Sequence, residues 1–113
     1  QRKIYQELSN HRPTTIAIRV SGSFLPHLPR SNGTLAFRAV PNSPLSSLIK
    51  STGYLLAPSA NPKDLPPARN ITEAVEYFGE TVAVYVDSGK VSDVKPSQII
   101  AFGDENRVVY IRE

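Results

Sequence analysis

The 113-residue chain contains no cysteine, only two histidines and no long apolar run. Without cysteine it can form neither a disulfide framework nor a thiolate metal site, and it suits a reducing, cytoplasmic location. His11 and His27 are not at metal-ligand spacing, so we expect no metal held by protein side chains. No run approaches the roughly 20 apolar residues that span a bilayer, and no signal peptide is visible. We therefore expect a cytoplasmic protein without a membrane partner.

Several familiar catalytic motifs are also missing from the sequence. They include G-x-G-x-x-G, the Walker phosphate loop, the G-x-S-x-G nucleophile elbow and the H-E-x-x-H zinc motif. The net charge of +3 and the pI of about 9.4 are only mildly basic. This charge permits contact with a phosphate or with RNA, but an ordinary solvated surface explains it equally well.

The hydrophobic pattern alternates between strands and helices. We expect helices at residues 43–52 and 70–78, a helix end at 3–9, and strands at residues 14–20, 34–40, 54–57, 81–86, 97–102 and 107–111. Ser43-Pro44 is a typical helix start, and Asn70 or Thr72 caps the later helix. The length suits one domain with a modest core. The prediction is a mixed α/β fold with a twisted sheet of about six strands and two or three helices.

Ser59-Ala60-Asn61 follows the short apolar segment 54–57 and precedes Pro66-Pro67. Backbone amides and a serine hydroxyl at a strand tip can hold a phosphate. A turn in which these side chains cap a neighbouring helix is the structural alternative. Local chemistry alone leaves both interpretations open.

Arg38 stands within the expected strand 34–40. Alternation places it on one face with Thr34, Ala36 and Val40, where a buried charge needs a partner. A carboxylate or phosphate could pair with it bidentately. On an edge strand, the same side chain would simply point into water.

Three further places are polar positions beside expected strands. Asp87-Ser88-Gly89 and Pro96-Ser97 are typical of turns, and Arg112 near the end of the last strand is typical of a solubilising residue. Each is unremarkable alone, but together they occur in a recognisable order along the chain.

That order resembles the carboxy-terminal half of the YrdC/Sua5 family, the threonylcarbamoyl-AMP synthases. The similar segments are Leu35–Pro41 with Ser43-Pro44-Leu45, Ala57–Asn61 with Leu65-Pro66-Pro67, Ile71–Val75 with Phe78-Gly79, Val86–Gly89, Pro96–Ile100, Ile111-Arg112 and, more faintly, Pro13-Thr14-Thr15. The resemblance covers roughly residues 11–113, and Ser59-Ala60-Asn61 is its most specific motif.

The resemblance implies an enzyme that makes L-threonylcarbamoyladenylate from L-threonine, bicarbonate and ATP, with Mg²⁺ accompanying the nucleotide. The product serves N6-threonylcarbamoyladenosine formation in tRNA, so tRNA or tRNA-modification proteins are expected partners. It implies that the nucleotide contacts are Thr34, Ser59, Asn61, Pro67 and Arg112. It implies that Arg38, Ala57 and Ser97 line the threonine end. It assigns no general acid or base.

Departures from the family pattern leave other interpretations open. The Lys-x-Arg nucleotide clamp of the family's amino-terminal half has no counterpart here, and Lys63-Asp64 replaces a Ser-Gly pair. We therefore expect a single domain over residues 1–113 that lacks this half and needs a dimer or a complementing chain. The alternative is a non-catalytic RNA-binding or regulatory module of the same fold. A carbamoyl-transferring hydrogenase-maturation relative is a third option, which would require additional domains.

Overall fold

The computed structural model describes residues 1–40, 43–91 and 95–113. It divides into two compact units. The first, which we call the sheet unit, comprises Gln1–Ser47 and Pro96–Glu113. The second, the α3 unit, comprises Leu48–Lys95, and each unit is described by itself.

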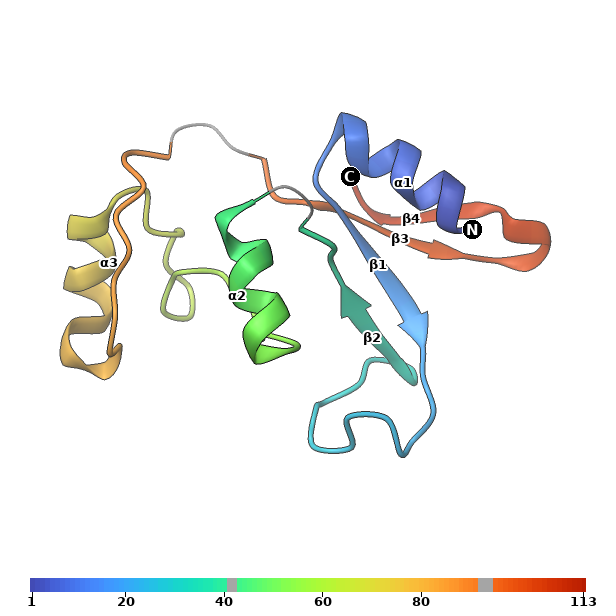
Figure 1. The fold of residues 1–113 in the computed structure, drawn as a ribbon, viewed down its shortest axis with the longest axis horizontal. Helices are drawn as coiled ribbons and strands as arrows, with labels where there is room; N and C mark the ends of the chain where they lie inside the picture. Colours follow the sequence, from blue (N-terminus) through green and yellow to red (C-terminus); the bar gives the residue numbers. More distant parts are fainter. Residues whose placement is uncertain (41–42, 92–94) are drawn as a thin grey trace. The chain divides into compact units, whose positions relative to one another are not determined.

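The sheet unit is built on four strands, β1 (Thr14–Arg19), β2 (Thr34–Phe37), β3 (Gln98–Phe102) and β4 (Val108–Arg112). They are arranged in the order β2-β1-β3-β4 (Figure 1). β1 pairs antiparallel with β2 and parallel with β3, and β3 pairs antiparallel with β4. With the helices below, this mixed sheet confirms the expected mixed α/β class, although the described residues form four strands and not six.

Helix α1 (Arg2–His11) lies against one face of this sheet (Figure 1). That face carries alternate apolar residues from neighbouring strands, including Ile16 and Phe37, which are paired across β1 and β2. The Tyr5 hydroxyl donates to the carbonyl oxygen of Thr14 at 2.9 Å and accepts the amide N–H of Ala39 at 3.0 Å. One side chain of α1 therefore holds the start of β1 and the backbone just beyond β2.

The core at the centre of the sheet is small. Among the described residues, the buried apolar side chains are Leu35 and Ile100, and Ile100 is fully enclosed. Two polar side chains are buried beside them, and the Gln98 amide donates to the Thr14 hydroxyl at 2.8 Å. This hydrogen bond offsets the desolvation of both groups.

Helix α2 (Pro44–Thr52) begins and ends as its sequence predicts. The Ser43 hydroxyl accepts the amide N–H of Leu45 at 3.3 Å. At the other end Gly53 adopts a φ of +83°, and its N–H donates to the carbonyl oxygen of Ile49 at 2.8 Å. A left-handed glycine at this position is a common helix stop.

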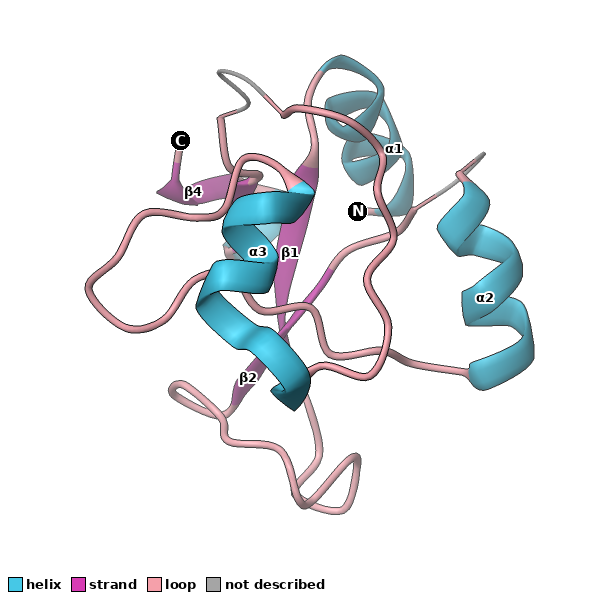
Figure 2. Ribbon diagram, turned by 90° about the vertical axis from the view of Figure 1, so that its left-hand side faces the viewer, coloured by secondary structure: helices cyan, strands magenta, loops and turns pink. Residues whose placement is uncertain are grey.

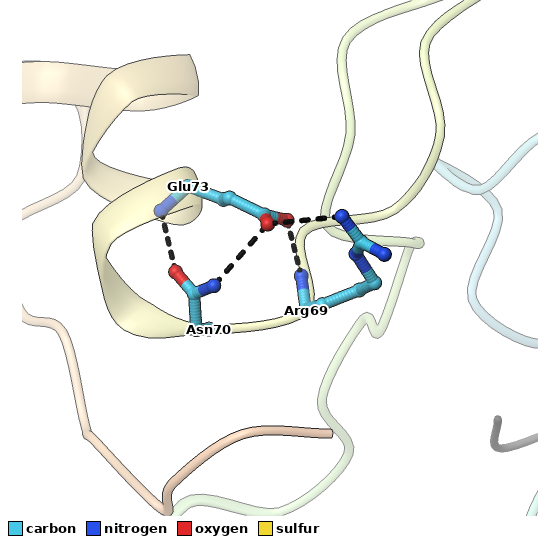
Figure 3. Close-up of polar contacts among 3 residues, drawn as sticks. All are labelled: Arg69, Asn70 and Glu73. Atoms are coloured by element: carbon cyan, nitrogen blue, oxygen red, sulfur yellow. Dashed lines mark hydrogen bonds and ion pairs between the residues drawn. The ribbon is translucent and has the colours of Figure 1, made fainter. Parts of the chain in front are cut away.

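Helix α3 (Ile71–Phe78) is capped by Asn70, whose side chain accepts the Glu73 amide at 2.9 Å. The Glu73 carboxylate accepts the backbone N–H of Arg69 at 2.9 Å and forms an ion pair with its guanidinium (Figure 3). These contacts resemble a capping box. The hydrogen bond from the Arg69 backbone is the main cause of the lowered pKa of Glu73.

The α3 unit has no described strand. Beyond α3 and the one-turn helix η1 (Gly79–Thr81), its described backbone is drawn as loop, apart from the last part of α2 (Figure 2). The expected strands at residues 54–57 and 81–86 are therefore wrong. Leu56, Val84 and Val86 are 75%, 73% and 83% exposed. The apolar pattern that predicted strands is present in the sequence, but no described strand pairs with these segments.

None of the helices in the described ranges is both long and apolar enough to cross a membrane.

Candidate functional site

Four polar residues, one from each strand or its flank, lie at the same end of the sheet. Arg38 follows β2, Thr15 lies near the start of β1, Ser97 precedes β3 and Arg112 ends β4. The register places them together, because Thr15 pairs with Ile99 and Ile99 also pairs with Arg112. The sheet thus brings three of the sequence-predicted residues to one end, with Arg38 beyond one edge strand, β2, and Arg112 on the other edge strand, β4.

Ser97 is the centre of this group. Its hydroxyl lies 2.8 Å from the Thr15 hydroxyl. The Arg112 guanidinium donates to the Ser97 carbonyl oxygen at 2.7 and 3.1 Å and reaches its hydroxyl at 3.4 Å. Arg112 is exposed and has no carboxylate partner among the described residues, so its positive charge is not neutralised by the protein there.

A register shift between Ile99 and Ile100 explains how Arg112 comes to lie opposite Ile99. A bulge of this kind bends a strand locally and redirects a side chain. Without the shift, strict alternation from Tyr110, which pairs with Ile100, would place Arg112 out of register with Ile99.

Thr15 and Arg112 belong to the sheet face opposite α1, whereas Arg38 lies beyond β2 and lines a hollow beside the end of α1. Strand alternation places Thr15 and Ile99 on this face, whereas Ile16 and Ile100 face α1. On the same face Ile99 lies between Thr15 and Arg112. Ala17, Ala36 and Ala101 follow one step further along the strands, so this part of the face carries small side chains.

Arg38 is exposed and lies one residue beyond the edge strand β2. The strand expected over residues 34–40 ends at Phe37, so Arg38 lies outside it. Because its side chain is exposed, it needs no buried counter-ion. The guanidinium has no ion pair with any described residue. The backbone at the following residue, Ala39, is held by Tyr5.

Thr34 lies at the opposite end of β2, where it pairs with Arg19. Asn32 and Gly33 have φ of +49° and +74°, so the backbone reverses in the tight turn typical of Asn-Gly. The Thr34 hydroxyl donates to the Ser31 carbonyl oxygen at 2.7 Å. Four residues of extended backbone separate Thr34 from Arg38, which corresponds to about 13 Å.

The remaining predicted residues, Ala57, Ser59, Asn61 and Pro67, belong to the α3 unit. Asn61 donates to the carbonyl oxygens of Pro62 and Leu65 at 3.1 and 2.9 Å. The Ala68 amide donates to the Ala60 carbonyl oxygen at 2.8 Å. These bonds close a loop over residues 60–68, so Asn61 shapes its own loop and caps no helix.

The Ser59 side chain is exposed, so its hydroxyl is available to a ligand. The Asn61 Oδ1 atom is buried and accepts no hydrogen bond from the described residues. An unsatisfied buried acceptor is uncommon, but an atom enclosed in this way is out of reach of a ligand.

Residues 87–89 form the expected turn, in which the Asp87 carboxylate accepts the Gly89 amide at 2.8 Å. Thr15, by contrast, is a site residue that was not selected from the sequence. Its signal was present in the segment Pro13-Thr14-Thr15, but only the sheet register shows that its hydroxyl meets Ser97.

Two comparisons with known proteins give a match. The family model Sua5_yciO_yrdC, described as "Telomere recombination", matches residues 2–113. A curated threonylcarbamoyl-AMP synthase from Moraxella catarrhalis (strain BBH18) is 34% identical over 96 residues, which cover 78% of this chain and 47% of the relative. The chain thus spans about half the length of this relative. No solved structure matches.

Proposed function

The chain belongs to the Sua5/YrdC family, and from this premise we propose that it carries part of a threonylcarbamoyl-AMP synthase site. The proposed reaction joins L-threonine, bicarbonate and ATP to L-threonylcarbamoyladenylate and releases pyrophosphate and water. The single observation that supports it most is the set of Arg38, Thr15, Ser97 and Arg112 at one end of the sheet. This set lies within residues 2–113, which the family model matches.

We assign the amino-acid end to Arg38, Ser97 and Ala57. The exposed Arg38 guanidinium suits bidentate contact with the threonine carboxylate, because its planar fork matches carboxylate geometry. Ser97 offers a hydroxyl whose position is set by Thr15 and Arg112. Ala57 contributes a small side chain beside the Ser59 loop.

We assign the nucleotide contacts to Arg112, Thr34, Ser59, Asn61 and the Pro67 backbone. Pyrophosphate release requires attack at the α-phosphorus of ATP, where negative charge accumulates on the phosphoryl oxygens. Arg112 would neutralise that charge, and hydroxyl and amide groups would position the phosphates. This chemistry depends on positioning and electrostatics, so it does not require a general acid or base from the protein.

Mg²⁺ would enter with the phosphates of ATP. Within the described ranges, no group of three or more His, Cys, Asp or Glu side chains could hold a metal. The donor set present therefore fits a metal carried by the nucleotide better than a resident one.

The proposed product would pass to tRNA-modification proteins, and the site would gain its remaining walls from a second chain or a second copy. Exposed apolar side chains in the α3 unit support this need for a partner, since Leu56 and Val86 are largely exposed. The need for a partner is also supported by the length of the match, which covers about half of the relative. We place this activity in the cytoplasm, where tRNA is modified.

The test is pyrophosphate release by the purified chain with ATP, Mg²⁺, L-threonine and bicarbonate, with each component omitted in turn. Binding of ATP to the chain is measured in parallel. We expect ATP binding that strengthens when threonine and bicarbonate are both present, and any turnover to require both. If ATP does not bind and no pyrophosphate forms under any combination, the proposal is wrong.

A further inference from the structure

A hollow of about 390 Å³ lies in the sheet unit, where the end of α1 meets the backbone beyond β2. Its lining includes Ser9, Arg12, Arg38 and Ser43. No acidic side chain occurs among the described residues that line it. The hollow is therefore positive, and neither guanidinium forms an ion pair with a described residue.

The walls of this hollow are held in place. The Arg12 backbone is extended at the end of α1, where its N–H donates to the Leu8 carbonyl oxygen at 3.1 Å and its own carbonyl oxygen accepts the Thr14 hydroxyl at 2.8 Å. On the other side, Tyr5 fixes the amide that follows Arg38. Of the carbonyl groups in the last turn of α1, the bond from the Arg12 N–H engages that of Leu8.

The Ser9 hydroxyl oxygen, beside the hollow, is buried and makes no hydrogen bond with the described residues. Buried hydroxyl groups almost always have a partner. Because this atom is enclosed by protein, a ligand in the hollow would not reach it, and the groups that could bind a ligand there are the two guanidinium groups.

We propose that this hollow binds a small dianion of the phosphate class, held between Arg12 and Arg38. Two guanidinium groups match the two charges and the several acceptor oxygens of a phosphate or sulfate group. A singly charged carboxylate would use only one of them. The volume exceeds what a bare tetrahedral anion needs, so the hollow also has room for the small molecule that carries the phosphate.

The inference goes beyond the proposed function. Arg12 and Ser9 have no role in that proposal, and the ligand is neither ATP nor threonine. Arg38 is shared by the two, so a bound dianion would exclude the threonine carboxylate from the same guanidinium. Phosphate would then regulate the site by competition.

The experiment titrates the ¹⁵N-labelled chain with inorganic phosphate, sulfate, glycerol phosphate or acetate at constant ionic strength. Binding constants come from amide chemical shifts. We expect the dianions to shift the amides of residues 9–14 and 38–40 and to bind more tightly than acetate. A preference for glycerol phosphate over inorganic phosphate would identify a phosphomonoester as the ligand, and the reverse would identify the free ion.

Three variants test the two guanidinium groups. Arg12→Gln and Arg38→Gln should each weaken phosphate binding about tenfold, the lower end of what a charge-assisted hydrogen bond contributes. Arg12→Lys should retain part of the affinity, because it keeps the charge but loses the fork. Arg107→Gln, which changes the net charge equally at an exposed residue outside the hollow, should alter affinity less than twofold.

Equal weakening in Arg107→Gln would overturn the proposal, because binding would then follow net charge alone. Shifts that avoid residues 9–14 and 38–40, or acetate binding as tightly as phosphate, would also overturn it. Since these titrations contain no ATP, threonine or bicarbonate, their outcome is independent of synthase activity. Circular dichroism of each variant distinguishes lost binding from lost folding.

Discussion

The sheet unit and the α3 unit contain similar apolar segments with different outcomes. Residues 14–19 and 98–102 are rich in β-branched or apolar residues and pair as neighbouring strands around the buried Ile100. Residues 82–86 have an equally clear alternation, yet they belong to no described strand and Val86 is 83% exposed. A strand pattern is therefore realised only where a second strand and a face to bury against are available.

The same contrast applies to the candidate site. In the sheet unit, Ser97 and Arg112 are positioned by a ladder of paired strands and by direct hydrogen bonds. In the α3 unit, Ser59 and Asn61 are positioned by local loop bonds alone. We infer that the sheet unit supplies the better organised half of the contacts, and that the Ser59 loop is completed by its ligand or partner.

The largest expected effect is on the core of the sheet unit. Ile100→Ala should lower the free energy of unfolding by about 2–5 kcal/mol, because it leaves a cavity at a fully buried position. The matched change in the α3 unit, Leu56→Ala, should cost less than about 0.5 kcal/mol because that side chain is exposed. Urea unfolding followed by circular dichroism measures both. Similar costs at the two positions would mean that Leu56 is buried in solution and that the contrast is wrong.

A smaller effect is expected at the bridge between α1 and the sheet. Tyr5→Phe removes a hydroxyl that joins the Thr14 carbonyl oxygen to the Ala39 amide, and it should cost about 1–2 kcal/mol. Hydrogen exchange at the Ala39 amide should also accelerate. Tyr110→Phe is the control, because no hydrogen bond of its hydroxyl is seen among the described residues. Unchanged exchange at Ala39 in Tyr5→Phe would show that the bridge does not form.

Removing the cap of α3 should lower stability by a similar or smaller amount. Asn70→Ala removes the acceptor for the Glu73 amide and should destabilise the helix by about 1 kcal/mol. Asn70→Asp keeps an acceptor at the helix start, but it replaces the amide that donates to Glu73 Oε1 at 3.2 Å by a second carboxylate oxygen, so it should retain only part of the stability. Exchange rates of the first amides of α3 report the difference. Equal rates in both variants would indicate that Asn70 is not the cap.

The smallest effect concerns acid pH. Glu73 has a lowered pKa in the folded chain. Its ionised carboxylate therefore stabilises the fold above the pKa of the unfolded chain, and this stabilisation is lost as pH falls through the pKa of the folded chain. An NMR titration of the Glu73 carboxyl should therefore have a midpoint below 4.5. Arg69→Gln should restore the midpoint only partly, because the backbone N–H of residue 69 remains the main donor. Complete restoration would contradict that order of causes.

The elements of the sheet unit were predictable because each has a local signal and a partner. The alternation of Leu35 and Phe37, the Asn-Gly turn and the cap at Ser43 all act over a few residues, as does the Asn70 cap in the α3 unit. The absence of strands at residues 54–57 and 81–86 could not be predicted, because local propensity contains no information on whether a pairing strand exists. The contact of Thr15 with Ser97 spans 82 residues and depends on the sheet register, which no local pattern specifies.

The site itself was recognised from the order of its motifs and not from local chemistry. Arg38, Ser97 and Arg112 each look like ordinary surface positions when taken singly. All three lie at the same end of the sheet, and a bulge places Arg112 opposite Ile99. The proposed ligand would occupy the face of the sheet that α1 leaves uncovered.

The most direct test of this account is to map where the substrates bind. The amide spectrum of the ¹⁵N-labelled chain is recorded with ATP, Mg²⁺, threonine and bicarbonate, in the wild type and in Arg112→Gln. The account predicts shifts at Thr15, Arg38, Ser97 and Arg112 that are strongly reduced in the variant. Shifts confined to the α1 side of the sheet, or equally large in Arg112→Gln, would contradict it.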